Sequence, residues 1–121
     1  MRTRFIRIET TSKMERHDTI DLVKDLLSRG GAWVFDFKMF SNNILTIQFA
    51  VTAEDVHKLQ EQLRQTTLMV HEASMQQLDE LAAEVELASE REKLKELNGG
   101  FVVHFIHNDP DLIIEVPAVP G

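Results

Sequence analysis

The sequence predicts an α+β fold, because segments with the two-residue period of strands alternate along the chain with segments of helical periodicity. The clearest strand signal is a pair of apolar, alternating segments at 32–40 and 44–51, with three polar residues between them. The clearest helical signals lie at 18–29 and 54–65, where apolar residues recur every three or four positions. At 121 residues, the chain has the length of a single domain that can bury a core.

The first two elements are a strand and a helix. Residues 4–9 predict a strand that places two isoleucines on one face. Residues 10–17 show no periodicity and are expected to form a loop. A helix is then expected to begin at Asp18, whose side chain can cap the first turn, and to end at the glycine pair 30–31, because glycine readily terminates helices.

A β-hairpin is expected next, formed by the segments 32–40 and 44–51. The residues SNN between them favour a turn, since asparagine tolerates positive φ. Both strands are expected to turn an apolar face towards the core beneath the two helices. The residues predicted on that face are Trp33, Phe35, Phe37 and Met39 in the first strand and Leu45, Ile47, Phe49 and Val51 in the second.

The second helix and a fourth strand complete a unit of six elements. Thr52 is a suitable N-cap for the helix, and residues 68–73 predict a short strand after it. The order over residues 3–73 is then β-α-β-β-α-β, the ferredoxin-like or split βαβ arrangement. Helices on one face of such a sheet leave the other face to be covered by a partner or by solvent.

Residues 74–121 are predicted to extend the core at 1–73, so that the whole chain forms one domain. Ser74 and Gln77 have the spacing of a capping box, which predicts the start of an added long helix reaching about Leu97. A C-terminal β-hairpin is expected after it, with strands at 101–107 and 112–116 and a turn at 108–111.

Composition narrows the classes of function. The chain has 20 acidic and 13 basic residues and a formal net charge of −7, whereas nucleic-acid binding depends on Lys and Arg contacts to phosphates, so we expect no nucleic-acid partner. The absence of cysteine excludes a disulfide framework, a thiolate zinc site and a cysteine nucleophile. No apolar run approaches the roughly 20 residues that span a bilayer, and the N-terminus lacks the apolar region of a signal peptide. We therefore expect a cytoplasmic protein without a membrane partner.

One segment, VVHFIHNDPD at 102–111, gathers two histidines and two aspartates. In a regular strand the side chains of His104 and His107 would point to opposite faces. Asp109 precedes a proline, as is common in turns. The favoured interpretation is therefore a strand followed by a turn. The alternative is a small enzyme or metal-binding protein that uses His104, His107 and Asp109. No nucleophile elbow, P-loop or dinucleotide-binding motif is present, which favours a non-enzymatic protein without catalytic residues or a cofactor.

Residues 18–73 resemble the ACT domain family and its relatives. The resemblance rests on the helix DTIDLVKDLLSRGGA, the strands WVFDFKMF and ILTIQFAV around SNN, and the helix EDVHKLQEQLRQ followed by TTLMVHEA. It implies a non-enzymatic module that forms a homodimer or senses a small-molecule effector. Such an effector would contact the loop before the first helix, at Glu15, Arg16, His17 and Asp18.

Overall fold

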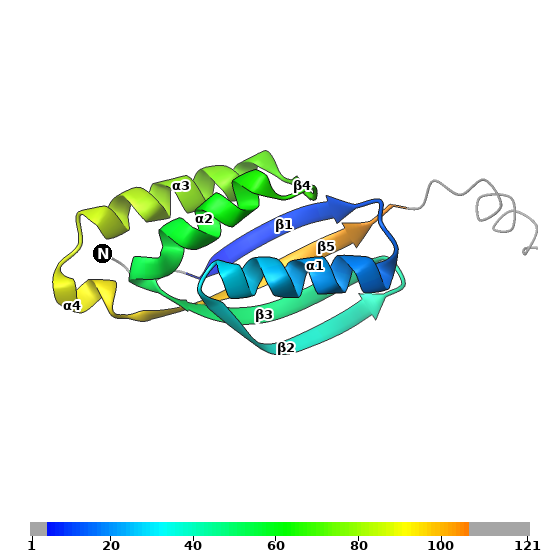
Figure 1. Ribbon diagram of the computed structural model, residues 1–121, viewed down its shortest axis with the longest axis horizontal. Coiled ribbons are helices and arrows are strands. Elements are labelled where there is room, and N and C mark those ends of the chain that lie inside the picture. Colours follow the sequence, from blue (N-terminus) through cyan, green and yellow to red (C-terminus); the bar gives the residue numbers. More distant parts are fainter. Residues whose placement is uncertain (1–4, 107–121) are drawn as a thin grey trace, which may run out of the picture.

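The computed structural model describes residues 5–106. These residues form five strands and four α-helices, which confirms the predicted α+β class (Figure 1). A short 3-10 turn, Ala53–Asp55, precedes the second helix. In chain order the elements are β1 (Ile6–Ser12), α1 (Arg16–Arg29), β2 (Ala32–Ser41), β3 (Ile44–Thr52), α2 (Val56–Gln65), β4 (Met69–Val70), α3 (Glu72–Glu86), α4 (Glu90–Lys93) and β5 (Glu96–Phe105).

All five strands belong to one mixed sheet with the order β2-β3-β5-β1-β4. The element order up to β4 is the predicted β-α-β-β-α-β, but the sheet does not have the predicted ferredoxin-like strand order. In the split βαβ arrangement β1 and β3 would be neighbours. Here β5 lies between them, parallel to β1 and antiparallel to β3, so the predicted C-terminal extension supplies the central strand.

The burial of β5 explains its central position. Five consecutive residues, 99–103, are buried, which means that side chains on both faces of the strand are covered. A continuous apolar run of this kind is typical of a strand with neighbours on both sides and packing on both faces. The turn at 108–111 and the second hairpin strand at 112–116 lie outside the described residues.

The segment between β4 and β5 also differs from the predicted single helix. The helix α3 ends at Glu86, and α4 begins three residues after Leu87, with a capping box formed by Ser89 and Glu92. The strand β5 then starts at Glu96, so Leu97 is a fully buried strand residue rather than the end of a helix. The helical segment ends here, and the chain continues as β5 into the middle of the sheet.

The predicted capping box at Ser74 and Gln77 is wrong. The helix α3 begins at Glu72, and its N-cap residue, His71, makes no side-chain capping bond. The Ser74 hydroxyl instead accepts a hydrogen bond from the backbone N–H of Glu9 at 2.9 Å. Ser74 therefore ties the first turn of α3 to β1.

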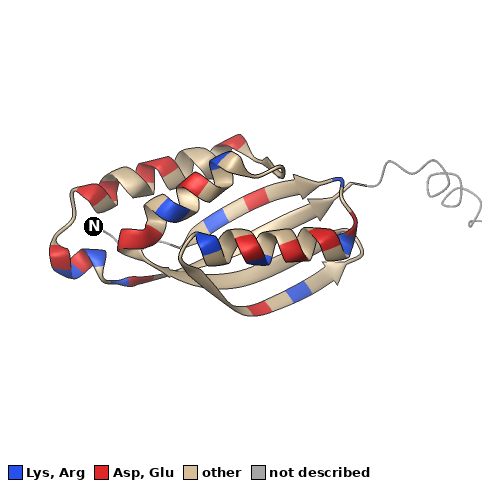
Figure 2. Ribbon diagram, in the orientation of Figure 1, with Lys and Arg blue, Asp and Glu red and all other residues tan. Residues whose placement is uncertain are grey.

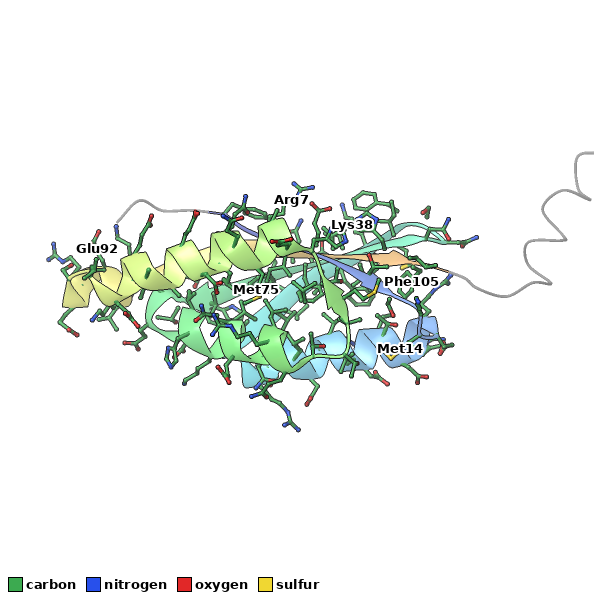
Figure 3. All side chains as sticks on the ribbon, turned by 90° about the horizontal axis from the view of Figure 1, so that it is seen from above. Arg7, Met14, Lys38, Met75, Glu92 and Phe105 are labelled. Carbon is green, nitrogen blue, oxygen red and sulfur yellow. The ribbon has the colours of Figure 1, made fainter. Side chains whose placement is uncertain are left out.

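The core lies between the sheet and the helices α1 and α2, with α3 flanking β1. Figure 3 shows α1 and α2 on one side of the sheet and the side chains of Arg7 and Lys38 on the other. The four core positions predicted in β3 are all buried, as is the helical stripe of α2. The largest buried side chains are Ile8 from β1, Leu45, Ile47, Phe49 and Val51 from β3, Leu97 and Phe101 from β5, Val23 and Leu27 from α1, Val56 and Leu59 from α2, and Leu78 from α3.

Candidate functional site

The two edges of the sheet are protected very differently. The edge at β4 is only two residues long, and the start of α3 adjoins β1 there through a hydrogen bond from the His71 N–H to the Glu9 carbonyl oxygen. The opposite edge is β2, which is ten residues long and, among the residues that the structure describes, pairs only with β3. Long exposed edges are rare in monomeric proteins because their unpaired N–H and C=O groups can pair with another chain.

Large apolar side chains are concentrated along this open edge. Every β2 residue from 35 to 41 is exposed, although the strand has only two charged residues, Asp36 and Lys38. Figure 2 shows them as one red and one blue band on an otherwise uncharged strand. We use the term β2 apolar edge for the residues Trp33, Phe35, Phe37, Met39 and Phe40, whose exposed fractions lie between 37% and 68%.

The predicted burial of Trp33, Phe35, Phe37 and Met39 in the core is therefore wrong, and an irregularity in the strand explains why the four side chains do not share one face. Val34 lies opposite Phe49 and Asp36 lies opposite Gln48, so Phe35 is an extra residue with no partner in β3. Such a β-bulge shifts the alternation of side chains by one residue. A second shift, between Met39 and Ser41, leaves Phe40 without a partner in the same way.

The bulge at Phe35 divides the β2 apolar edge between the two faces of the sheet. Trp33 lies opposite Ala50 and points to the face without helices, whereas Phe37 lies opposite the buried Ile47 and points to the helix side. There the ammonium group of Lys24 in α1 lies 5.4 Å from the centre of the Phe37 ring. The edge thus presents apolar surface on both faces, with the regular segment 36–39 between the bulges.

The predicted effector contacts lie at the start of α1. Glu15, not Asp18, is the N-cap: its carboxylate accepts hydrogen bonds from the His17 N–H at 2.7 and 3.0 Å. The Arg16 guanidinium donates to the carbonyl oxygen of Asn42 in the β2–β3 turn at 3.3 Å. All four residues from 15 to 18 are exposed, and effector binding by them stays a prediction.

A surface pocket of about 350 Å³ lies away from these residues, between the start of β1 and α3. Its lining carries one cation, Arg7, and one carboxylate, Glu80, beside Phe5 and Gln77. The predicted effector contacts at 15–18 line neither this pocket nor two others, one beside α2, α3 and α4 and one between α1 and α2.

Two histidines meet on the face of the sheet without helices. The His104 Nε2 lies 3.3 Å from a carboxylate oxygen of Glu9, and the His71 Nε2 lies 3.0 Å from the Thr11 hydroxyl. The two imidazole rings are stacked, with centres 5.9 Å apart. No local sequence pattern could have predicted this group, because the residues that contact each other are 33 to 95 positions apart in the chain.

The alternative site at His104, His107 and Asp109 receives no support from the described residues. His107 and Asp109 lie outside them, so the convergence of the three groups is untested. Within residues 5–106, no three histidine or carboxylate side chains are placed to hold a metal ion. His104 itself is engaged by Glu9 and His71, in a polar group that connects β1, β5 and the start of α3.

No protein-family model matches the chain, and neither a curated protein nor a solved structure shows significant similarity to it. In the part of the chain that the structure describes, no helix is both long enough and apolar enough to cross a membrane.

Proposed function

We propose that this protein is a non-enzymatic module that forms a homodimer through the β2 apolar edge. The observation that carries the proposal is the coincidence of two features in one strand: a ten-residue edge that no other described segment pairs with, and five large, exposed apolar side chains. Exposed apolar residues scattered singly need no explanation, but a contiguous group of them marks an interaction site. Adding a strand to an open edge is a common way to bind a peptide or a protein chain.

A second copy of this chain is the partner that the edge fits best. Closed two-fold symmetry is the commonest arrangement of oligomers, and it requires a surface that complements itself. An antiparallel pair of β2 strands would place apolar residues on apolar residues and would join two five-stranded sheets into one. Dimerisation is also what the ACT-like pattern of residues 18–73 implies, although the central position of β5 departs from a ferredoxin-like sheet.

We also propose a cytoplasmic location and a small-molecule effector. A cytoplasmic location suits a chain with no cysteine, because the module then needs no oxidising compartment. A small-molecule effector at residues 15–18 would complete the ACT-like role. A ligand that binds the native state raises the melting temperature, so a thermal-shift screen with free amino acids tests that part.

The test of dimerisation is the molar mass in solution, measured by sedimentation velocity over a wide range of protein concentration. We expect a reversible dimer. Phe35→Lys and Phe40→Lys change residues at the two bulges, where neither has a partner in β3, so both variants should fold. Each places a charge twice in the interface, and we expect a Kd of dimerisation at least 10-fold higher, corresponding to about 1.4 kcal/mol or more.

Leu87→Lys is the matched control. Leu87 is 90% exposed between α3 and α4, so the substitution exchanges an apolar side chain for the same charge away from β2. The control should dimerise like the wild-type chain. A wild-type chain that stays monomeric at every concentration would refute the proposal, and so would equal weakening by Leu87→Lys and Phe35→Lys.

A further inference from the structure

Resting on the proposed function, we infer that the dimer has one specific register, in which Phe37 faces its own copy across the two-fold axis and Asp36 faces the partner's Lys38. A two-fold axis between antiparallel strands passes midway between a residue and its own copy. The register is therefore fixed by the choice of that one residue. Charge and local geometry each select Phe37.

Charge selects Phe37 because Asp36 and Lys38 are the only charged residues of β2. An axis at Phe37 places each of them directly opposite the other residue of the partner, which forms two cross-strand ion pairs. An axis at Asp36 would instead oppose two carboxylates, and an axis at Lys38 would oppose two ammonium groups. Like charges directly opposite each other destabilise a strand pair, whereas opposite charges stabilise it.

Geometry selects the same residue because a regular ladder needs a segment without bulges. The irregularities at Phe35 and Phe40 leave residues 36–39 as the regular part of β2. The pairs formed by residues 36, 37 and 38 with their counterparts fall within this segment. Neither Asp36 nor Lys38 has an ion-pair partner among the described residues, so both side chains are available for the partner.

The two faces of the joined sheet would then have different roles. Asp36 and Lys38 lie opposite Gln48 and Thr46, so both point to the face without helices, where their ion pairs would be accessible to water. Phe37 points to the helix side, where two Phe37 rings would meet between the two α1 helices. Apolar contact would supply the affinity, and the charges would supply the register.

A single introduced cysteine tests the register directly, because the natural chain has none. In the Phe37→Cys variant the two thiols would sit on Cα atoms about 5 Å apart, within the range of a disulfide. In Phe35→Cys and Met39→Cys, the same register separates the two copies by about 13 Å along the strands. Under mild oxidation we expect a covalent dimer from Phe37→Cys and none from the other two, with far-ultraviolet circular dichroism confirming that all three variants fold.

Charge exchange provides an independent test. Asp36→Lys alone and Lys38→Asp alone would each oppose like charges twice, and we expect at least a 10-fold higher Kd for each homodimer. Mixing the two variants restores both ion pairs, so we expect the heterodimer to form in preference to either homodimer. The double variant Asp36→Lys/Lys38→Asp should dimerise about as well as the wild-type chain.

The outcomes separate the register from dimerisation itself. If Phe35→Cys or Met39→Cys forms the covalent dimer instead, or if the mixed charge variants show no preference for each other, the register is wrong while the β2 dimer survives. If the wild-type chain is a monomer and no variant is cross-linked, the proposed function and the register fail together. A dimer that is insensitive to every β2 substitution would place the interface elsewhere and overturn both.

Discussion

Phe49 of β3 lies directly opposite Gly99 of β5, and its ring occupies the space that a β-carbon on residue 99 would need. The Ile6 carbonyl oxygen approaches the same position, 2.8 Å from an ideal β-carbon, from the other neighbouring strand. Phe49 is fully buried. The contact therefore fixes how closely β3 and β1 approach β5, and a side chain at residue 99 would push them apart.

Gly99→Ala should be strongly destabilising for this reason. The φ angle of Gly99 is not positive, so the alanine backbone itself is unstrained and the cost is steric. Inserting a methyl group into a packed core typically costs about 1–3 kcal/mol, and we expect a loss of unfolding free energy in that range. Urea unfolding followed by circular dichroism measures it.

Gly100→Ala is the control for this prediction. A β-carbon on residue 100 would lie 3.4 Å from the Phe5 ring, an ordinary contact on the face without helices. Gly100 is also buried, but the added methyl group meets no atom closer than this, so we expect a change within about 0.5 kcal/mol. Equal losses for the two variants would show that the loss of glycine, rather than the contact with Phe49, determines stability.

The central position of β5 could not be predicted from local patterns, although its existence could. The run FVVHF predicted a strand, and the structure confirms one there. Its pairing depends on which edge of β1 and β3 is free, and periodicity carries no information about neighbours distant in sequence. The uninterrupted apolar run GGFVV at 99–103 is compatible with a strand buried on both faces, but it does not identify the neighbouring strands.

Ser74→Ala tests the contact between α3 and β1 that replaces the predicted capping box. Ser74 is buried, and its hydroxyl is the acceptor for the Glu9 N–H. Removing the hydroxyl leaves that N–H without this partner, which typically costs about 1–3 kcal/mol. We expect a loss of this size in unfolding free energy, measured by thermal or chemical unfolding.

Gln77→Ala distinguishes the two roles of Ser74. In a capping box the Gln77 side chain would also support the helix start, and both substitutions would weaken α3. In the structure Gln77 is an exposed residue in the first half of α3, so we expect a change within about 0.5 kcal/mol. Comparable losses from Ser74→Ala and Gln77→Ala would contradict the observed role.

In β2 the sequence periodicity correctly predicts a strand but wrongly places all four apolar side chains on one face of the sheet. Alternation at residues 33, 35, 37 and 39 predicted one apolar face, and the strand itself is confirmed. One extra residue at Phe35 reverses the alternation, and nothing in the residue types marks phenylalanine as a bulge position. The β3 prediction succeeded because its ladder with β5 is regular from Ile44 to Thr52.

A buried pair of hydroxyl groups holds the loop between β1 and α1. The oxygens of Ser12 and Thr19 lie 2.8 Å apart, and both residues are buried. Thr19 donates its proton to the Glu15 carbonyl oxygen at 2.9 Å, so the Ser12 hydroxyl is the donor to Thr19. Ser12 also accepts from the Met14 N–H at 3.1 Å. The loop that leads into the predicted effector contacts is therefore fixed from within.

Thr19→Val should be costly although it preserves shape and burial. The Glu15 carbonyl oxygen would keep the bond from the Thr19 backbone N–H, but the Ser12 hydroxyl would lose its acceptor in a buried site. We expect a loss of about 1–3 kcal/mol in the unfolding free energy. Thr67→Val, at an exposed position, should change it by less than about 0.5 kcal/mol.

A double-mutant cycle with Ser12→Ala completes this prediction. Once Thr19→Val has removed the acceptor, Ser12→Ala removes a hydroxyl that has already lost its partner. The double variant should therefore lose less stability than the sum of the two single losses, with a coupling of about 0.5–3 kcal/mol. Additive losses would mean that the two hydroxyl groups act independently, and the short contact between them would then contribute nothing to holding the loop.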